Sequence, residues 1–250
     1  MWFKSVVIIT SLIAVWQIIV WITGAPPFIV PAPLAVATAL IGNLGLIGFH
    51  ATVTIFEIIA GLLLGCTIGI GSAWLILQFQ PVRTWFLPIL VASQALPVFA
   101  IAPVLMLWLG FGMPSKIAMA TLIIYFPVTA ALYDGLRNTD SGWIDMARIM
   151  GASKHTVAKF IRLPAALPSL GSGLRIAAAV APIGAVVGEW VGSSSGLGYL
   201  MLHANARSQI DLMFAALIVL AAFAVLLYFG IDSLIKKTIF WQTETTLEAH

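Results

Sequence analysis

Two carboxylates, Glu57 and Glu189, are the only acidic residues that lie clearly inside long apolar stretches of this sequence. A carboxylate in hydrocarbon is energetically expensive, so each should face other helices or water rather than lipid. Gln94 is a third buried polar candidate, and Trp190 directly follows Glu189. These side chains can offer hydrogen bonds and an aromatic stacking face, either to a solute or to neighbouring helices.

Sequence patterns typical of catalytic sites are missing. The chain has no Gly-Lys-Ser or Gly-Lys-Thr of a phosphate-binding loop and no His-Glu-x-x-His of a zinc protease. Its four histidines, His50, His155, His203 and His250, are scattered, and the single cysteine, Cys66, cannot form an intrachain disulfide. We therefore expect no catalytic residue, no metal site and no cofactor in this chain.

The composition indicates a single polytopic, all-α membrane domain. The chain has 250 residues, of which 61% are hydrophobic and 8% charged, and its mean hydropathy is +1.08. A soluble domain usually has about 25% charged residues, so a cytosolic enzyme, a disordered chain and a secreted disulfide scaffold are excluded. The apolar runs are long and continuous, unlike the alternating strands of a membrane barrel. About six spans of ~20 residues fit this length.

Six transmembrane helices are predicted between the polar and proline-rich breaks. The first resembles a signal peptide, but Pro26 follows the small residues where cleavage would occur, which favours an uncleaved helix. A short interfacial helix is expected at residues 34–40, begun by Pro33. The predicted spans cover residues 5–23, 51–79, 85–109, 116–133, 171–191 and 212–234.

The basic residues predict the orientation. With six spans, both termini lie on the same side of the membrane, and the positive-inside rule places the more basic side in the cytoplasm. Only Lys116 and Arg207 fall on the other side, and Arg175 lies near the inner end of the fifth span. The residues on the cytoplasmic side are Lys4, Arg83, Arg137, Arg148, Lys154, Lys159, Arg162, Lys236 and Lys237.

The longest polar segment, residues 134–164, is predicted to form a hairpin of two short helices on this basic face. Its first helix can be capped by Asp140 or Ser141, whose side-chain oxygens accept from free N–H groups of a first turn. This helix should end at Gly151, because glycine adopts the left-handed cap conformation without strain.

The second helix of the hairpin can be capped by Ser153 and should end at Pro164. Val157, Phe160 and Ile161 recur at helical spacing and form an apolar stripe along it. A basic amphipathic hairpin of this kind is suited to docking on a soluble partner, although a simple linker at the membrane surface has the same composition.

The hairpin resembles the EAA loop of the permease subunits of ABC importers. That pattern is Glu-Ala-Ala, three residues, Gly, nine residues, and Ile-x-Leu-Pro. This chain matches the spacing with Asp145-Met146-Ala147, Gly151 and Ile161-Arg162-Leu163-Pro164. It departs from the pattern at Asp145, which has a shorter reach than Glu, and at Met146, which replaces the first Ala. The resemblance implies that Asp145, Ala147, Gly151, Ile161, Leu163 and Pro164 couple the chain to an ATPase.

The resemblance covers most of the chain. The segment Gly188-Glu189-Trp190-Val191-Gly192, followed by Ser195-Gly196-Leu197-Gly198-Tyr199-Leu200, is similar to the nitrate, sulfonate and taurine branch of these permeases. Within that branch, Met201-Leu202-His203-Ala204-Asn205 most resembles permeases for thiamine precursors of the hydroxymethylpyrimidine type.

Membership of such a family implies a type I importer permease of six transmembrane helices. Its partners would be a second copy of itself, two cytoplasmic ATPase subunits that bind ATP and Mg, and a periplasmic or lipid-anchored binding protein. ATP binding would draw the coupling helices together and switch the pore from inward to outward facing. The candidate pathway residues would be Glu57, Gln94, Glu189 and Trp190. The alternatives are that the two glutamates bind neighbouring helices and that Trp190 is an interfacial anchor.

Glycines at four-residue spacing predict close helix packing, either within this subunit or at a moving interface. Pro97, Pro103 and Pro182 are expected to kink the third and fifth spans. A different class, an ion-coupled secondary transporter, would use the membrane carboxylates as its ion site, but no convincing internal repeat supports it. The glycine rows are Gly61, Gly65 and Gly69 in the second span and Gly184, Gly188 and Gly192 in the fifth.

Overall fold

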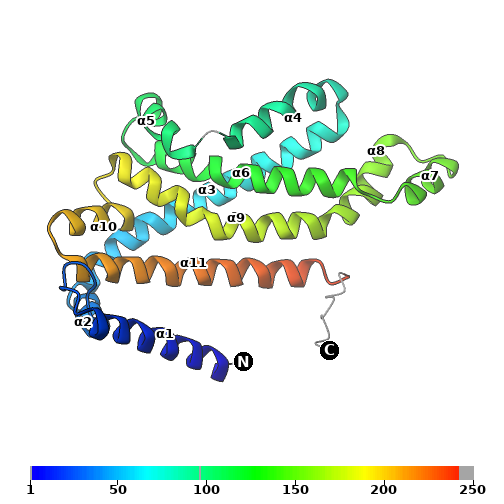
Figure 1. The fold of residues 1–250 in the computed structure, drawn as a ribbon. Helices are drawn as coiled ribbons and strands as arrows, with labels where there is room; N and C mark the ends of the chain where they lie inside the picture. The colour runs from blue at the N-terminus through cyan, green and yellow to red at the C-terminus, as the bar shows by residue number, and fades with distance from the viewer. Residues whose placement is uncertain (1, 96, 242–250) are drawn as a thin grey trace. The chain divides into compact units, whose positions relative to one another are not determined.

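The computed structural model describes residues 2–95 and 97–241, without the side chains of residues 2–5, 91 and 93–95. All regular structure in this part of the chain is helical, which confirms the predicted class (Figure 1). The helices are α1 (Trp2–Thr23), α2 (Pro33–Gly42), α3 (Leu44–Gln78), α4 (Gln80–Ala95), α5 (Val98–Leu109), α6 (Met113–Arg137), α7 (Ser141–Ile149), α8 (Lys154–Val157), a π-helical turn (Ala158–Arg162), α9 (Leu163–Gly192), α10 (Leu197–Ala206) and α11 (Ile210–Thr238).

Five stretches among the described residues are long and apolar enough to cross a membrane. They lie in α1, α3, α6, the continuous segment Lys154–Gly192 and α11, and they correspond to five of the six predicted spans. The observed helices extend beyond the predicted apolar cores. For example, α3 begins at Leu44 rather than at residue 51, because only Asn43 separates it from α2.

The third predicted span, residues 85–109, is not one helix. It consists of the end of α4 and the whole of α5, and α5 is too short to cross a membrane alone. Pro97 has an extended conformation at this break, with φ −64° and ψ 118°. Proline lacks an N–H and disfavours a helical residue before it, so Pro97 breaks the span rather than kinking it. Pro103 and Pro182, in contrast, lie inside α5 and α9.

The prediction that Pro164 ends the second hairpin helix is wrong. Residues Lys154–Gly192 form one continuous helical segment of 39 residues. The π-helical turn Ala158–Arg162 immediately precedes Pro164. A π turn bonds each N–H one residue further back, so it accommodates a residue without an N–H and with a bulky ring. The second arm of the hairpin is therefore the beginning of α9 rather than a separate helix.

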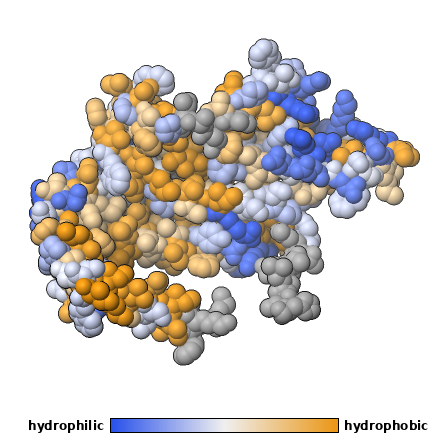
Figure 2. Space-filling view, viewed as in Figure 1, coloured by the Kyte–Doolittle hydropathy of each residue, from blue (hydrophilic) through white to orange (hydrophobic). Residues whose placement is uncertain are grey.

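The chain divides into two compact units, which we describe separately. The first unit contains Met1–Phe56 and Glu189–Phe223, and so includes α1, α2, the start of α3, α10 and the first half of α11. Within it, the rings of Trp16 in α1 and Phe214 in α11 stack with centroids 5.8 Å apart. Most of the other α1 side chains that the structure describes are apolar and exposed, as lipid contact requires (Figure 2).

The second unit contains Glu57–Gly188 and Ala224–His250, and α6 is its central packing element. A Cβ at Gly61 of α3 would lie 2.5 Å from Ala120 Cβ, and one at Gly184 of α9 would lie 2.7 Å from Ala120 Cα. Both helices therefore approach α6 more closely than any side chain allows. These contacts support the interpretation that the glycine rows pack helices within one subunit. Other close approaches to α6 are made by Gly65, Gly69, Gly173 and Gly188.

Candidate functional site

Both arms of the hairpin begin with side-chain caps. Asp140 precedes α7 and accepts a hydrogen bond from the Gly142 N–H at 2.6 Å. Ser153 precedes α8 and accepts from the Thr156 N–H at 3.2 Å. Each cap satisfies an N–H that has no partner inside the helix. The prediction of two capped arms is confirmed, with Asp140 rather than Ser141 as the first cap.

The turn of the hairpin depends on Gly151. Its φ is +82°, as the sequence predicts. The Gly151 N–H donates to the Arg148 carbonyl and the Ala152 N–H to the Ala147 carbonyl, each at 2.9 Å. These two bonds make the Schellman motif that closes a helix through a left-handed residue. The backbone at Gly151 therefore sets the angle between the two arms.

The hairpin has a small apolar core of its own. Ile144 and Ala147 of α7 are buried against Val157 of the second arm, and Ala152 and Ile161 pack around them. This core packs the two arms against each other. The hairpin is therefore a preformed element rather than a loose linker.

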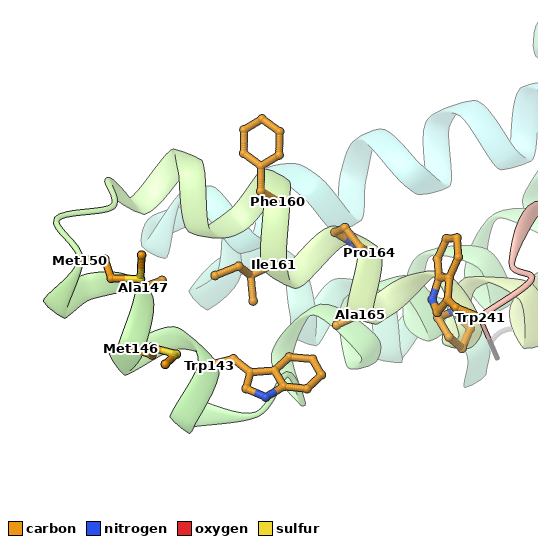
Figure 3. Close-up of a pocket in the computed structure, with 10 residues that line it drawn as sticks. Trp143, Met146, Ala147, Met150, Phe160, Ile161, Pro164, Ala165 and Trp241 are labelled. Atoms are coloured by element: carbon orange, nitrogen blue, oxygen red, sulfur yellow. The ribbon is translucent and has the colours of Figure 1, made fainter. Parts of the chain in front are cut away.

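Large apolar side chains remain on the outside of the hairpin. Phe160 is 67% exposed, so the predicted stripe is wrong at this residue: the π turn rotates Phe160 away from the face that carries Val157. These exposed side chains form much of the wall of an apolar groove of about 630 Å³ (Figure 3). Its lining residues are Trp143, Met146, Ala147, Met150, Phe160, Ile161, Pro164, Ala165, Pro168 and Trp241.

The carboxylate of Asp145 lies on the surface of α7. It pairs with Arg148 at 3.4 Å, and both side chains are about 60% exposed. An exposed pair one helical turn apart is worth only about 0.3–0.5 kcal/mol, so it does not commit Asp145 to this partner. Of the other residues in the matched motif, Ala147, Ile161 and Pro164 line the groove, and Leu163 begins α9.

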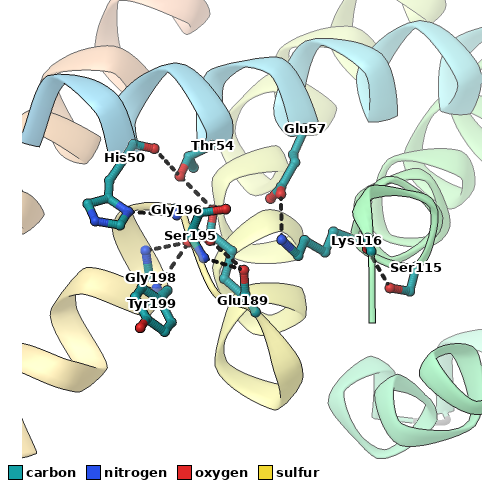
Figure 4. A network of polar contacts seen from close by, with 12 residues as sticks. His50, Thr54, Glu57, Ser115, Lys116, Glu189, Ser195, Gly196, Gly198 and Tyr199 are labelled. Atoms are coloured by element: carbon teal, nitrogen blue, oxygen red, sulfur yellow. Dashed lines mark hydrogen bonds and ion pairs between the residues drawn. The ribbon is translucent and has the colours of Figure 1, made fainter. Parts of the chain in front are cut away.

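Glu189 binds the start of α10 in the first unit. Its side chain is only 1% exposed, and its Oε2 accepts hydrogen bonds from the N–H groups of Gly198 and of Tyr199, the latter at 3.2 Å (Figure 4). A carboxylate at a helix N-terminus satisfies free donors and complements the positive end of the helix dipole. Gly196 has φ +114°, and a Cβ there would collide with this carboxylate.

His50 and Thr54 complete the cap of α10. The Gly196 N–H donates to His50 Nδ1 at 3.0 Å, and the Leu197 N–H donates to Thr54 Oγ1 at 2.7 Å. Thr54 in turn donates its hydroxyl proton to Glu189 Oε1 at 2.6 Å. Because Nδ1 is an acceptor here, the neutral His50 ring carries its proton on Nε2. Three side chains thus satisfy four consecutive N–H groups at the beginning of one helix.

Glu57 lies in the second unit and forms a buried ion pair. Its Oε1 is 3.3 Å from Lys116 Nζ, and the two side chains are 0% and 5% exposed. This pair joins α3 to α6. A cation at this distance offsets part of the cost of burying a carboxylate away from water. Both glutamates therefore contact neighbouring helices, as the alternative interpretation of the sequence predicts. A role for them in the solute pathway stays a prediction.

The other two predicted pathway residues lie on different helices. Trp190 donates its indole N–H to the Gly198 carbonyl at 3.1 Å, and its ring is 52% exposed. It therefore belongs to the same contact region as the α10 cap. Gln94 falls in α4, but its side chain lies outside the part that the structure describes.

Sequence reasoning missed His50, Thr54 and Lys116. His50, Thr54 and Glu57 follow one another at i, i+4 and i+7 in an otherwise apolar helix. A polar stripe with helical period inside a membrane span indicates a face turned toward other polar groups. That pattern was available in the sequence. The identity of the partners was not, because they lie far away along the chain.

These features define a multi-pass helical membrane protein that carries an exposed helical hairpin. The family model for the "Binding-protein-dependent transport system inner membrane component" matches residues 61–239. The chain belongs to this family, whose members are the permease subunits of ABC importers. A permease of this kind works in a membrane with a separate ATPase and a substrate-binding protein.

Individual proteins agree with this assignment. A probable ABC transporter permease protein of Haemophilus influenzae is 54% identical over 94% of this chain and 96% of its own length. The formylaminopyrimidine transport permease protein ThiX of Halalkalibacterium halodurans is 34% identical over 92% of each chain. The riboflavin transport system permease protein RibX of Chloroflexus aurantiacus is 34% identical over 92% of this chain and 87% of its own.

The fold has a counterpart among solved structures. A chain of the MetNI methionine ABC transporter, in an inward-facing conformation, superposes with a TM-score of 0.64 over 75% of this chain and 93% of its own. The two sequences are 20% identical. This likeness supports the permease fold.

Proposed function

We propose that this ABC-importer permease carries a small polar organic solute, and that the solute is a thiamine precursor such as hydroxymethylpyrimidine. The proposal is supported by the resemblance of residues 201–205 to permeases for such precursors. A relative named for formylaminopyrimidine transport, 34% identical over 92% of each chain, supports the same class of substrate. Sulfonate, taurine or nitrate is the alternative cargo for the same role.

The observation that carries the coupling proposal is the continuity of the hairpin with α9. The second arm and α9 form one helical segment from Lys154 to Gly192, and the buried core of the hairpin fixes the first arm to it. A push on the hairpin by a docked ATPase would therefore move α9 as a lever. The proposed coupling residues are Asp145, Ala147, Gly151, Ile161, Leu163 and Pro164.

The groove beside these residues suits such a contact. It is open, apolar and about 630 Å³ in volume, and Trp143 and Met150 are exposed beside it. Exposed apolar side chains of this size usually mark an interaction surface. In this proposal the ATPase binds ATP and Mg. The permease contributes to ATP-driven coupling through its docking surface and binds no ATP itself.

The proposed assembly contains two copies of the chain and two ATPases, with a periplasmic or lipid-anchored binding protein on the outer side. The chain would lie in the inner membrane of a bacterial cell with both termini in the cytoplasm. ATP binding would bring the two hairpins together and turn the pathway outward. The pathway candidates remain Glu57, Gln94, Glu189 and Trp190.

Reconstitution tests this proposal directly. Proteoliposomes that contain the permease, its ATPase and its binding protein should accumulate labelled hydroxymethylpyrimidine only when ATP is present. Excess unlabelled hydroxymethylpyrimidine should suppress the uptake, whereas taurine should not. ATP-dependent accumulation of labelled taurine but not of labelled hydroxymethylpyrimidine would replace the substrate and keep the permease role. Uptake by the permease without ATPase, driven by an ion gradient, would instead support a secondary transporter.

A further inference from the structure

A second pocket of the second unit is basic rather than apolar. It has a volume of about 280 Å³ and lies where α3 ends, α4 begins and the hairpin packs. Hydrophilic side chains gather at the hairpin end of this unit in Figure 2. The residues that line the pocket are Ile76, Leu77, Gln78, Gln80, Arg83, Arg148, Ala152, Lys154, Val157, Ala158 and Arg162. Four of them are cations, and none is a carboxylate.

Most cations of this pocket have no carboxylate partner in the part of the chain that the structure describes. Among the described residues, no carboxylate lies within ion-pair distance of Arg83, Lys154 or Arg162, whereas Arg148 reaches only the exposed Asp145 at 3.4 Å. Like charges gathered in one pocket repel one another unless an anion joins them. The pocket therefore has room and charge for an anionic group.

A buried donor points to the same kind of ligand. Gln78 Nε2 is inaccessible to solvent and has no hydrogen-bond partner among the described residues. An amide N–H₂ buried without an acceptor is destabilising, and native proteins rarely leave one unsatisfied. Its place beside four cations indicates that the missing group is an acceptor with negative charge.

The surroundings of the pocket favour a lipid as the source of this anion. The inner wall is apolar, formed by residues such as Ile76, Leu77 and Val157, and it adjoins the ends of membrane helices. Phe79 and Trp85 lie within two residues of lining residues along the chain, and they are 54% and 78% exposed. Exposed aromatic side chains next to basic ones are typical of the interface between acyl chains and headgroups. We infer that this pocket binds the phosphate group of an anionic phospholipid.

This inference does not depend on the solute or on the ATPase, because headgroups border both faces of a membrane. In the orientation proposed above, the lipid belongs to the cytoplasmic leaflet and lies against the arm that carries Arg162. A bound phosphate would then join the end of α3 to the hairpin by charge-assisted hydrogen bonds.

Native mass spectrometry of the purified complex tests the inference. The complex would be equilibrated with vesicles of phosphatidylglycerol and phosphatidylethanolamine in equal amounts, and the retained lipids counted. Wild type should retain phosphatidylglycerol preferentially. The double variant Arg83→Gln/Arg162→Gln should weaken that retention about thirtyfold, since each basic residue near an anionic surface contributes about a fivefold effect. Gln78→Leu should weaken it severalfold by removing the buried donor.

Lys159→Gln is the matched control, because Lys159 lies on the same π-helical turn but does not line the pocket. It should leave retention unchanged, and the melting temperatures of all variants would establish that they fold.

Equal retention of both lipids by wild type, or equal loss in the Lys159→Gln control, would overturn the inference. Binding of inorganic phosphate without preference for phosphatidylglycerol would overturn the lipid as its source. Loss of ATPase binding in the double variant, with lipid retention unchanged, would assign the pocket to the ATPase instead.

Discussion

At the scale of single residues, the hydroxyl of Thr54 connects two segments that are distant in sequence. It accepts from the Leu197 N–H and donates to Glu189, and it is fully buried. Thr54→Val keeps the shape and removes both bonds, so it should lower the free energy of unfolding by about 1–3 kcal/mol. The melting temperature of the purified permease would measure this effect.

Thr52→Val is the control for that change. Thr52 lies on the same helix, is exposed, and its hydroxyl bonds only to the Phe49 carbonyl of its own helix. This variant should leave the melting temperature nearly unchanged. Similar losses in both variants would mean that the cap of α10 contributes little to stability.

Glu189 offers a test that separates structural and pathway roles. Gln can still accept from the Gly198 and Tyr199 N–H groups through its amide oxygen. It loses the charge, which is worth about 0.3–2 kcal/mol at a helix N-terminus, and the second oxygen that accepts from Thr54. Leu leaves both donors buried without an acceptor, and the cost is about 1–3 kcal/mol for each. We expect Glu189→Gln to give nearly normal yields and Glu189→Leu to give little folded permease.

Uptake at matched amounts of folded complex completes the Glu189 test. If Glu189 also lines the solute pathway through its charge, Glu189→Gln should reduce uptake while the yield and ATPase binding stay normal. Normal uptake by Glu189→Gln would leave only the cap of α10 as its role.

At the scale of elements, the hairpin depends on the backbone of Gly151. Its φ of +82° disfavours any residue with a Cβ, and β-branched residues most of all, although a Cβ at this position would have no neighbouring atom within 4 Å. Gly151→Val should strain the turn by about 1–3 kcal/mol and reduce both uptake and stimulation of the ATPase, with insertion in the membrane preserved. Gly151→Asn, which tolerates this conformation better, should retain most of both activities. Equal activity of the Val and Asn variants would argue against a role of this turn in coupling.

Because α3 contacts α6 closely at Gly61 but not at Gly71, alanine substitutions at these two positions of α3 should change stability in opposite directions. Gly61→Ala places a methyl group 2.5 Å from Ala120 Cβ and should destabilise the permease by about 1–3 kcal/mol. Gly71→Ala, where no atom lies within 4 Å, should stabilise the helix by up to about 1 kcal/mol. Thermal unfolding of the two variants would measure both effects, and a neutral Gly61→Ala would mean that α3 and α6 separate easily.

At the scale of the whole molecule, one chain carries one hairpin, and an importer that closes two ATPases needs two. We therefore expect the mass of the purified complex to fit two copies of this chain with two ATPases. Light scattering coupled to gel filtration would measure this mass. A stable complex that transports solute with a single permease copy would contradict the proposed dimer.

The sequence by itself determined the features that depend on local chemistry. Long apolar runs predicted membrane helices, because a buried backbone in lipid must satisfy its own hydrogen bonds. The cap at Asp140 and the left-handed turn at Gly151 followed from the conformational preferences of single residues. The spacing from Asp145 to Pro164 indicated the family, because all residues of that motif lie within one short stretch of the chain.

Only the tertiary structure decided which groups meet across large separations in sequence. Glu57 has Lys116 as its partner, and Glu189 binds N–H groups beside His50 and Thr54. The hydrogen-bond partner of a buried polar group is set by packing, and packing is not encoded in the local preferences of either residue. The different effects of two prolines were likewise decided by the folded structure. Pro97 interrupts a predicted span, whereas the helix continues through Pro164 because a π turn forms directly before it.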